Sequence, residues 1–369
     1  MRRTQLSRST RLLSIAAVAA VGAASLAACS DDKSDSGGGD KVGVILPDSA
    51  SSARWETADR PLLEKAFKDA GVGYDIQNAG GDVNKFSTIA DGMISSKVKV
   101  LMMVNLDSDS GAAVIKKATA AGIPVIDYDR LTLGGGANYY VSFDNVLVGT
   151  KIGEGLVKGM KANGKNNGPV VLLDGSPTDN NATLFSTGYK KAITDAGYTV
   201  AAQQAVKDWD NQQALTDFEQ IFTKLGAGGI DGVAAANDGL AGSVASVLAK
   251  NNLTGKIPVT GQDATDEGLQ RVLLGSQYVT IYKAIKKEAD AASQLAIKII
   301  KGDKAGADAL ATAKSDDTVT KKQVPSILLT PQPIYKENVK DVVADGFTTK
   351  DKICTTAELK AACAANGIN

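Results

Sequence analysis

The chain has 369 residues with 41 basic and 41 acidic side chains, so its formal net charge is zero at pH 7. This balance gives no electrostatic attraction for nucleic acid. Hydrophobic residues make up 43% of the sequence, which is enough for two hydrophobic cores. There is no histidine, which excludes Ser-His-Asp catalysis, Cys-His catalysis and histidine-ligated metal sites. The sequence predicts no metal site and no cofactor.

The N-terminal segment has the features of an export signal. Four arginines in the first 11 residues precede an apolar, alanine-rich stretch over 12–28, which is short for a membrane span. The sequence Leu-Ala-Ala-Cys at 26–29 resembles a bacterial lipobox, in which the signal peptide is cut before the cysteine and the cysteine is lipidated. We expect residues 1–28 to be a lipoprotein signal peptide and Cys29 to carry the lipid. The alternative is a secretory signal with an incidental cysteine.

The segment that follows is polar and rich in glycine. Residues 30–40 read SDDKSDSGGGD, and we expect 29–40 to be a flexible tether. Such a tether would hold a folded body close to a membrane. The protein is therefore expected to be extracytoplasmic, anchored to the outer face of the cell membrane through the lipid on Cys29.

From Lys41 onward, short apolar runs typical of buried strands alternate with amphipathic stretches typical of helices. Strands are expected near 42–46, 74–77, 98–104, 123–128, 139–144, 170–173, 199–202, 232–236 and 259–261. Helices are expected near 54–70, 85–95, 111–121, 149–162, 182–196, 212–224, 240–249 and 284–301. Repeated βα units of this kind indicate an α/β fold with two doubly wound parallel-sheet lobes.

Three stretches are expected to connect the lobes, and they lie at Ser142–Asn145, Gln277–Lys283 and Ile327–Pro333. The helix expected over 284–301 would then return to the first lobe. This gives an N-terminal lobe and a C-terminal lobe, each made of two segments. The predicted segments are 41–143 plus 284–328 for the N-terminal lobe, and 144–283 plus 329–369 for the C-terminal lobe.

Polar residues recur where the predicted strands end. These clusters are Asn105-Leu106-Asp107, Asp127-Tyr128-Asp129-Arg130, Asp174 to Asn181, Asn237-Asp238 and Gln262-Asp263. In open parallel sheets, ligands bind beyond the carboxyl ends of the strands. A single Asp or Asn at such a turn is commonly a helix cap, and it is the recurrence over five turns that favours a binding site.

The side chains near these turns suit a polyol. Sugar hydroxyls both donate and accept hydrogen bonds, and carboxylates, amides and guanidinium groups meet both needs. Trp55 and Trp209 lie outside the apolar strands, where an indole can present a flat face to the CH face of a sugar ring. A helix cap or the edge of a core is the alternative for each tryptophan. The polar mixture is offered by Arg54, Asp129, Arg130, Asn237, Asp263 and Lys283.

A set of motifs, in order along the chain, resembles one protein family. They are Arg54-Trp55, Tyr128-Asp129-Arg130, Ser142-Phe143-Asp144-Asn145, Gly175-Ser176-Pro177, Asp179-Asn180-Asn181-Ala182, Asn237-Asp238, Gly261-Gln262-Asp263-Ala264, Tyr282-Lys283, Val324-Pro325-Ser326 and Leu329-Thr330-Pro331. With these motifs the chain resembles periplasmic sugar-binding proteins of the ribose/galactose class, and most closely the D-xylose-binding members that serve ABC importers. The resemblance covers roughly residues 41–347.

The resemblance implies a type I periplasmic-binding-protein fold, with two lobes joined by three crossovers and a sugar held between them. It also implies a monomer that captures a monosaccharide, most closely D-xylose, and delivers it by lobe closure to ABC permease subunits in the membrane. Trp55 and Trp209 would stack on the sugar. By the same resemblance, its hydroxyls would bond to Arg54, Asp129, Arg130, Asp179, Asn181, Asn237, Asp263 and Lys283.

Other functions compete with this one. The ligand can be another aldopyranose, such as glucose, galactose or arabinose, and the protein can serve a receptor as a sugar sensor. A glycoside hydrolase would need two carboxylates flanking the scissile bond, for which Asp129 and Asp263 are the candidates. A sugar-responsive transcription regulator would need an N-terminal helix-turn-helix, and the chain has an export signal in that position.

The chain has three cysteines. If Cys29 is lipidated, Cys354 and Cys363 remain as a pair in an exported protein, where disulfides persist. We expect them to form a disulfide that fixes the C-terminal tail to the second lobe. Free buried thiols are the alternative, and two cysteines without histidine are too few for a metal site.

Overall fold

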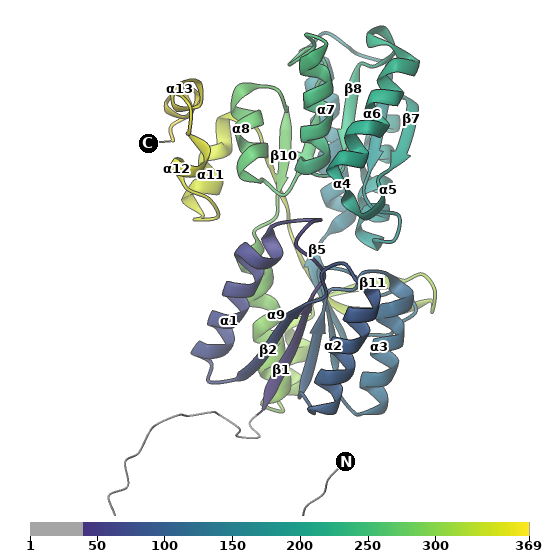
Figure 1. The fold of residues 1–369 in the computed structure, drawn as a ribbon, viewed down its shortest axis with the longest axis vertical. Coiled ribbons are helices and arrows are strands. Elements are labelled where there is room, and N and C mark those ends of the chain that lie inside the picture. The colour runs from purple at the N-terminus through teal and green to yellow at the C-terminus, as the bar shows by residue number, and fades with distance from the viewer. Residues whose placement is uncertain (1–39, 369) are drawn as a thin grey trace, which may run out of the picture. The chain divides into compact units, whose positions relative to one another are not determined.

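The computed structural model describes residues 40–368, in which strands and helices alternate (Figure 1). The predicted signal peptide, the lipobox with Cys29 and nearly all of the tether lie outside these residues. Within the described part of the chain, no helix combines the length and the apolar character that a membrane crossing needs.

The first sheet has seven strands in the order β11-β12-β5-β4-β3-β1-β2. Every neighbouring pair is parallel except β11 and β12, which are antiparallel. The strands are β1 (Lys41–Leu46), β2 (Gly73–Asn78), β3 (Val100–Met103), β4 (Val125–Tyr128), β5 (Tyr139–Phe143), β11 (Ala313–Asp317) and β12 (Lys322–Leu329).

Alternation along the strands divides this sheet between two cores. Val42, Val44 and Leu46 face one core together with helices α1 and α9, whereas Ile45 faces the other core together with α2 and α3. Figure 1 shows these helices on both sides of β1 and β2. The helices are α1 (Arg60–Asp69), α2 (Val83–Ser95), α3 (Ser108–Ala120), α9 (Ile285–Ile300) and α10 (Lys304–Leu310), with a π-helical turn at Trp55–Asp59 before α1.

The second lobe contains two three-stranded sheets, with orders β7-β6-β8 and β13-β10-β9. A single parallel bridge between Val233 and Val259 joins them. All pairs are parallel except β10 and β13. The strands are β6 (Pro169–Asp174), β7 (Thr199–Ala205), β8 (Gly232–Ala235), β9 (Thr260–Gln262), β10 (Val279–Tyr282) and β13 (Gln332–Ile334).

Helices α4 and α5 pack closely in this lobe. A Cβ built on Gly149 of α4 would collide with the backbone of Phe185 on α5, so the approach requires glycine there. This packing fixes the backbone of Phe185, which belongs to the site described below. The helices are α4 (Asn145–Ala162), α5 (Asn180–Asp195), α6 (Asn211–Leu225), α7 (Asp238–Lys250) and α8 (Asp266–Leu274), with 3₁₀ turns at Lys207–Trp209 and Ala227–Gly229.

The chain crosses between the lobes three times: after β5, after β10 and after β12. The α/β fold with two lobes and three crossovers is therefore confirmed. The predicted connecting stretches were too long. Gln277–Lys283 contains all of β10, and Ile327–Leu329 belongs to β12, because ladder hydrogen bonds continue almost to each crossing.

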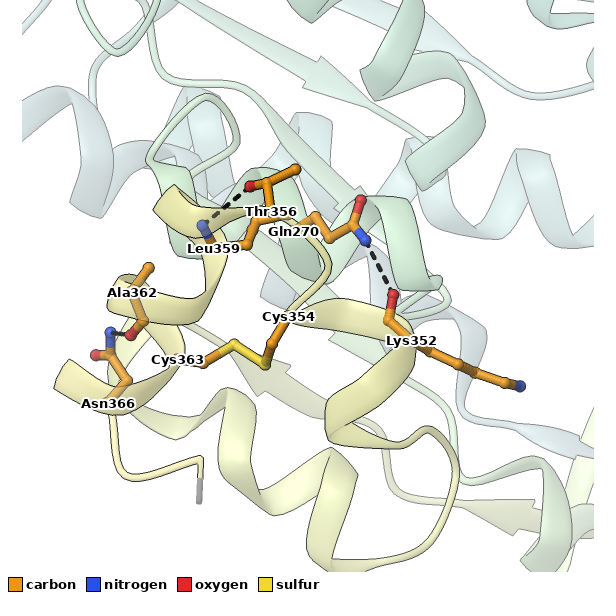
Figure 2. The surroundings of a disulfide bond; sticks show 8 residues. All are labelled: Gln270, Lys352, Cys354, Thr356, Leu359, Ala362, Cys363 and Asn366. Carbon is orange, nitrogen blue, oxygen red and sulfur yellow. Dashed lines mark hydrogen bonds between the residues drawn. A yellow bond between two sulfur atoms is a disulfide. The ribbon is translucent and has the colours of Figure 1, made fainter.

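The C-terminal tail packs against α8. It consists of a 3₁₀ turn at Lys336–Asn338 followed by α11 (Val339–Ala344), α12 (Lys350–Ile353) and α13 (Ala357–Ala365). A disulfide joins Cys354 to Cys363, and Figure 2 shows it next to the hydrogen bond from Gln270 Nε2 to the carbonyl of Lys352 (3.0 Å). Leu359 and Cys363 are buried in a small core that they share with Leu269 of α8.

Reduction of this disulfide should loosen the tail and leave the two lobes intact. The bridge closes a loop of about ten residues, worth roughly 2–3 kcal/mol in the chain-entropy model. We expect hydrogen exchange to speed up in α12 and α13, while α4 and α9 in the lobes keep the protection that they have in the oxidised protein. Mass spectrometry after alkylation without reductant is the control, and two alkylated cysteines in the C-terminal peptide would contradict the bridge.

Candidate functional site

One pocket collects the polar side chains from the ends of the strands. About 370 Å³ of atom-free space lies between its walls, part of it open to solvent. All ten residues that the sequence predicts to bind the ligand line this pocket. The full lining is Ser51, Ser52, Arg54, Trp55, Asp129, Arg130, Asp179, Asn181, Phe185, Trp209, Asn237, Gln262, Asp263 and Lys283.

Arg54 stands just before the π-helical turn, and its guanidinium is buried. Nε and Nη2 donate to both carboxylate oxygens of Asp59 (2.9 and 2.8 Å), and Nη1 donates to Asp129 Oδ2 (3.0 Å). Nη2 also donates to Glu288 Oε2 (2.6 Å). Burial would lower the pKa of Arg54, but the three carboxylates raise it well above its ordinary value. Arg54 is therefore a fixed cation at the wall of the pocket.

Two contacts join the lobes at the pocket. Asn181 Nδ2 donates to the backbone carbonyl of Asp129 (2.9 Å) and to its Oδ1 (3.1 Å). Arg130 Nε lies 3.0 Å from Asp179 Oδ2. Burial would raise the pKa of Asp129, but Arg54, Lys283 and Arg130 hold it below its ordinary value, so this carboxylate is ionised. The two walls thus meet through charge-assisted contacts.

Asp263 and Lys283 form an ion pair on the second lobe, with 3.0 Å between Oδ1 and Nζ. Asp263 and Ala264 both have positive φ (95° and 49°), an unfavourable backbone for these residues. The buried carboxylate of Asp238 stabilises this turn, because it accepts from the backbone N–H of Thr265 (2.9 Å). The same carboxylate also accepts from Thr280 Oγ1 (2.9 Å) and Gln277 Nε2 (2.7 Å).

Trp55 is buried at the pocket wall. The guanidinium of Arg54 lies 4.2 Å from the centroid of its ring, within the range of a cation–π contact. A ligand stacked on Trp55 would therefore use the opposite face of the indole. The indole N–H has no hydrogen-bond partner in the protein.

An unusual backbone conformation places the side chain of Trp209 in the pocket. Asp208 and Trp209 both adopt left-handed conformations (φ 54° and 58°), which turn the indole back over Gly175. Its Nε1 donates to Asp179 Oδ2 (3.2 Å), and its ring meets Phe185 edge to face at 6.5 Å between centroids. Neither tryptophan simply covers a core edge, because both line the pocket.

Several of the polar turn residues are helix caps as well as pocket residues. Asp179 Oδ1 accepts from the backbone N–H of Asn181, and Asn237 Oδ1 accepts from that of Leu240. By contrast, Asp107 caps α3 and does not line the pocket. The capping alternative and the binding interpretation are thus compatible at Asp179 and Asn237, since each residue caps a helix through Oδ1 and lines the pocket as well.

Unpartnered buried polar atoms gather in this pocket. Among residues 40–368, six buried side-chain N or O atoms form no hydrogen bond, and four belong to the lining. They are Trp55 Nε1, Arg130 Nε, Gln262 Oε1 and Asp263 Oδ1. Arg130 Nε and Asp263 Oδ1 each have an oppositely charged neighbour at 3.0 Å, but the contacts are not aligned as hydrogen bonds. Both donors and acceptors are thus available to a ligand.

Sequence reasoning missed four lining residues: Ser51, Ser52, Phe185 and Gln262. Gln262 stands inside the motif Gly261–Ala264 and Phe185 stands three residues after the motif Asp179–Ala182, whereas the loop with Ser51 and Ser52 carries no distinctive pattern. The sequence also missed two buried acids behind the lining, Asp59 and Glu288, and named Asp238 only as part of a turn cluster. No cluster of three or more side chains suited to a metal ion occurs in the part of the chain that the structure describes.

The family model of the periplasmic binding protein domain matches residues 42–304. The chain belongs to this family. It is 34% identical over 318 residues to the D-xylose-binding periplasmic protein of Haemophilus influenzae, covering 85% of this chain and 92% of that protein. It is 32% identical to the multiple sugar-binding periplasmic receptor ChvE of Rhizobium radiobacter, covering 91% and 97%. These relatives are binding proteins, so the prediction of a non-enzymatic role is confirmed for the family.

Solved structures agree with the family. The chain is similar to an ABC transporter solute-binding protein from Clostridium phytofermentans with bound β-D-glucose, with a TM-score of 0.75 and 29% identity, covering 85% of this chain and 99% of that one. It is also similar to a carbohydrate transporter solute-binding protein from Chloroflexus aurantiacus in complex with D-glucose, with a TM-score of 0.74 and 25% identity over 84% and 97%. The type I fold is confirmed.

Proposed function

We propose that this protein captures a monosaccharide, D-xylose in the first place, in the pocket between the lobes. The unpartnered atoms of the lining carry the proposal, because a polyol supplies the donors and acceptors that these atoms lack. The lining has three cations and three carboxylates, a balance that suits a neutral ligand better than a sugar phosphate or an amino acid. The names of the relatives favour D-xylose.

The individual roles follow from the chemistry of each side chain. Arg54, Asp129, Arg130, Asp179, Asn181, Asn237, Asp263 and Lys283 would bond the sugar hydroxyls, while Trp55 and Trp209 would contact the CH faces of the ring. Binding needs no covalent step. Contacts made to both lobes at once favour the closed arrangement, which is the form that a permease would recognise.

Delivery to an ABC permease and anchoring through a lipid on Cys29 are parts of the same proposal. A monomer tethered by residues 29–40 would stay near the membrane while its lobes open and close. Other aldopyranoses and a sensor role remain alternatives, and two observations favour keeping them. A similar solved structure holds β-D-glucose, and a similar relative is named a multiple sugar-binding receptor.

A thermal-shift screen tests the proposal. A ligand that binds only the folded state at a thousand times its Kd stabilises a protein by about 4 kcal/mol. We expect D-xylose to raise the melting temperature of the mature protein and to change its tryptophan fluorescence, with D-glucose, D-galactose and L-arabinose as comparisons. Sorbitol, an open-chain polyol, is the control. If no monosaccharide shifts melting at millimolar concentration, the proposal is wrong.

A further inference from the structure

Three carboxylates surround the guanidinium of Arg54. Asp129 lines the pocket, whereas Asp59 and Glu288 lie behind it, and both of these are 0% exposed. A guanidinium has five N–H groups. Asp59 and Glu288 together take three of them and Asp129 takes a fourth, so one N–H of Nη1 remains for a ligand. The two buried acids thus determine where that last donor points.

Arg54 and its three carboxylate neighbours, Asp59, Asp129 and Glu288, form a carboxylate cluster with three acidic groups and one basic group. The other cations of the pocket do not correct this, because Arg130 is paired with Asp179 and Lys283 with Asp263. Glu288 Oε1, moreover, has no hydrogen-bond partner. An uncompensated buried charge is costly, and a carboxyl group in this position avoids the cost by taking up a proton.

We infer that Glu288 is a positioning residue of the sugar site: it fixes Arg54 against Asp129, and a proton held by this carboxylate cluster is part of the sugar-bound state. The inference rests on the proposed function. It makes sugar capture dependent on pH, although Glu288 itself does not line the pocket.

The groups around Glu288 determine the direction in which the affinity for sugar changes with pH. Burial raises its pKa to about 8; Arg54 and Lys283 oppose this shift, and Asp129 and Asp59 add to it. Bound sugar replaces water next to Asp129 and Arg54, so the excess negative charge is less well solvated and the proton is held more tightly. Affinity is then highest below about pH 8 and falls as the pH rises through that value.

The other groups facing Glu288 do not titrate in this range. Burial raises the pKa of Tyr128 and of Tyr140 well above the ordinary value. Burial would lower the pKa of Lys283, but Asp263 and Asp129 raise it above its ordinary value. The Arg54 guanidinium stays charged throughout. Burial also raises the pKa of Asp127 on β4 to about 7, so the change in affinity that reports on the carboxylate cluster is the part centred near pH 8 that Glu288→Gln abolishes.

Calorimetric titration with D-xylose, or with the aldopyranose that the screen identifies, tests the inference. In the wild type, we expect Kd to rise above about pH 8 by up to about tenfold per pH unit. Repeating the titration in two buffers with different ionisation heats should reveal proton uptake on binding near pH 8.

Glu288→Gln is the informative variant, since the amide oxygen can still accept from Arg54 Nη2 and the group carries no charge at any pH. We expect it to bind sugar at neutral pH with a Kd that no longer depends on pH and without proton uptake. Glu337→Gln is the matched control at an exposed side chain (71%), and it should keep the wild-type profile.

The outcomes separate the two proposals. A wild-type protein that binds sugar with no pH dependence and no proton uptake would overturn the inference, and this test requires no variant to fold. A Glu288→Gln variant that keeps the wild-type pH profile would overturn it as well. In both cases the sugar-binding function would stand. If the wild type binds no monosaccharide at any pH, the proposed function fails and the inference fails with it.

Discussion

Asp129→Ala should weaken sugar binding by about 2–4 kcal/mol, which is roughly 30- to 1000-fold in Kd. The side chain accepts from Arg54 Nη1 on its own lobe and from Asn181 Nδ2 on the other. Its removal leaves a buried guanidinium donor without an acceptor and takes away the side-chain half of the contact between Asp129 and Asn181, while the hydrogen bond to the Asp129 backbone carbonyl can persist. Calorimetry with the sugar identified in the screen measures the loss.

Two further variants separate the effect of the Asp129 carboxylate from effects on the backbone and on helix capping. Asp129 has φ 63°, so Asp129→Asn tolerates the backbone better than alanine while also removing the charge. Asp107→Ala is the control at a similar turn outside the pocket. It should cost about 1 kcal/mol of stability through the lost helix cap and leave Kd unchanged. Near-normal affinity in both Asp129 variants would remove this residue from the site.

The order of strands and helices from β1 to β9 and most of the pocket lining were predictable from the sequence because both depend on local patterns, whereas α8, β10 to β13 and α10 to α12 were not among the expected elements. Alternating apolar runs mark strands whatever their partners, and parallel topology brings the carboxyl ends of the strands to one edge. Asp179, Asn237 and Asp263 therefore come together although up to 84 residues separate them along the chain. No long-range information was needed beyond the expectation of a parallel sheet.

The buried acids behind the pocket could not be predicted in this way. Glu288 stands in α9 next to Lys286 and Lys287, where a glutamate looks like part of a solvated helix face. It is buried because α9 returns to the first sheet and packs against it, a contact between segments more than 200 residues apart. Trp209 depends on two successive left-handed residues; Asp is enriched in this conformation but Trp is not, and no local pattern predicts the pair.

Gly175→Ala is expected to displace Trp209 and so to weaken sugar binding. A Cβ on Gly175 would overlap the six-membered ring of the indole, and a rigid aromatic ring cannot yield as a flexible chain end can. The indole must move off, which breaks its hydrogen bond to Asp179 and its edge contact with Phe185. We expect the free energy of sugar binding to weaken by roughly 1.5–3 kcal/mol, which is the value of burying one large apolar side chain. The tryptophan emission of the variant should change as well.

Gly92→Ala is the matched control for this substitution. Gly92 lies in α2, and a Cβ there meets no heavy atom within 4 Å. Alanine in a helix interior is favoured over glycine by about 0.5–1 kcal/mol, so this variant should melt slightly higher and bind sugar as the wild type does. If Gly175→Ala retains wild-type affinity although its emission spectrum shows that Trp209 has moved, then Trp209 makes no contact that matters to the ligand. Specificity would in that case rest on Trp55 and the charged side chains, because Trp55 would be the one tryptophan left to contact a sugar ring.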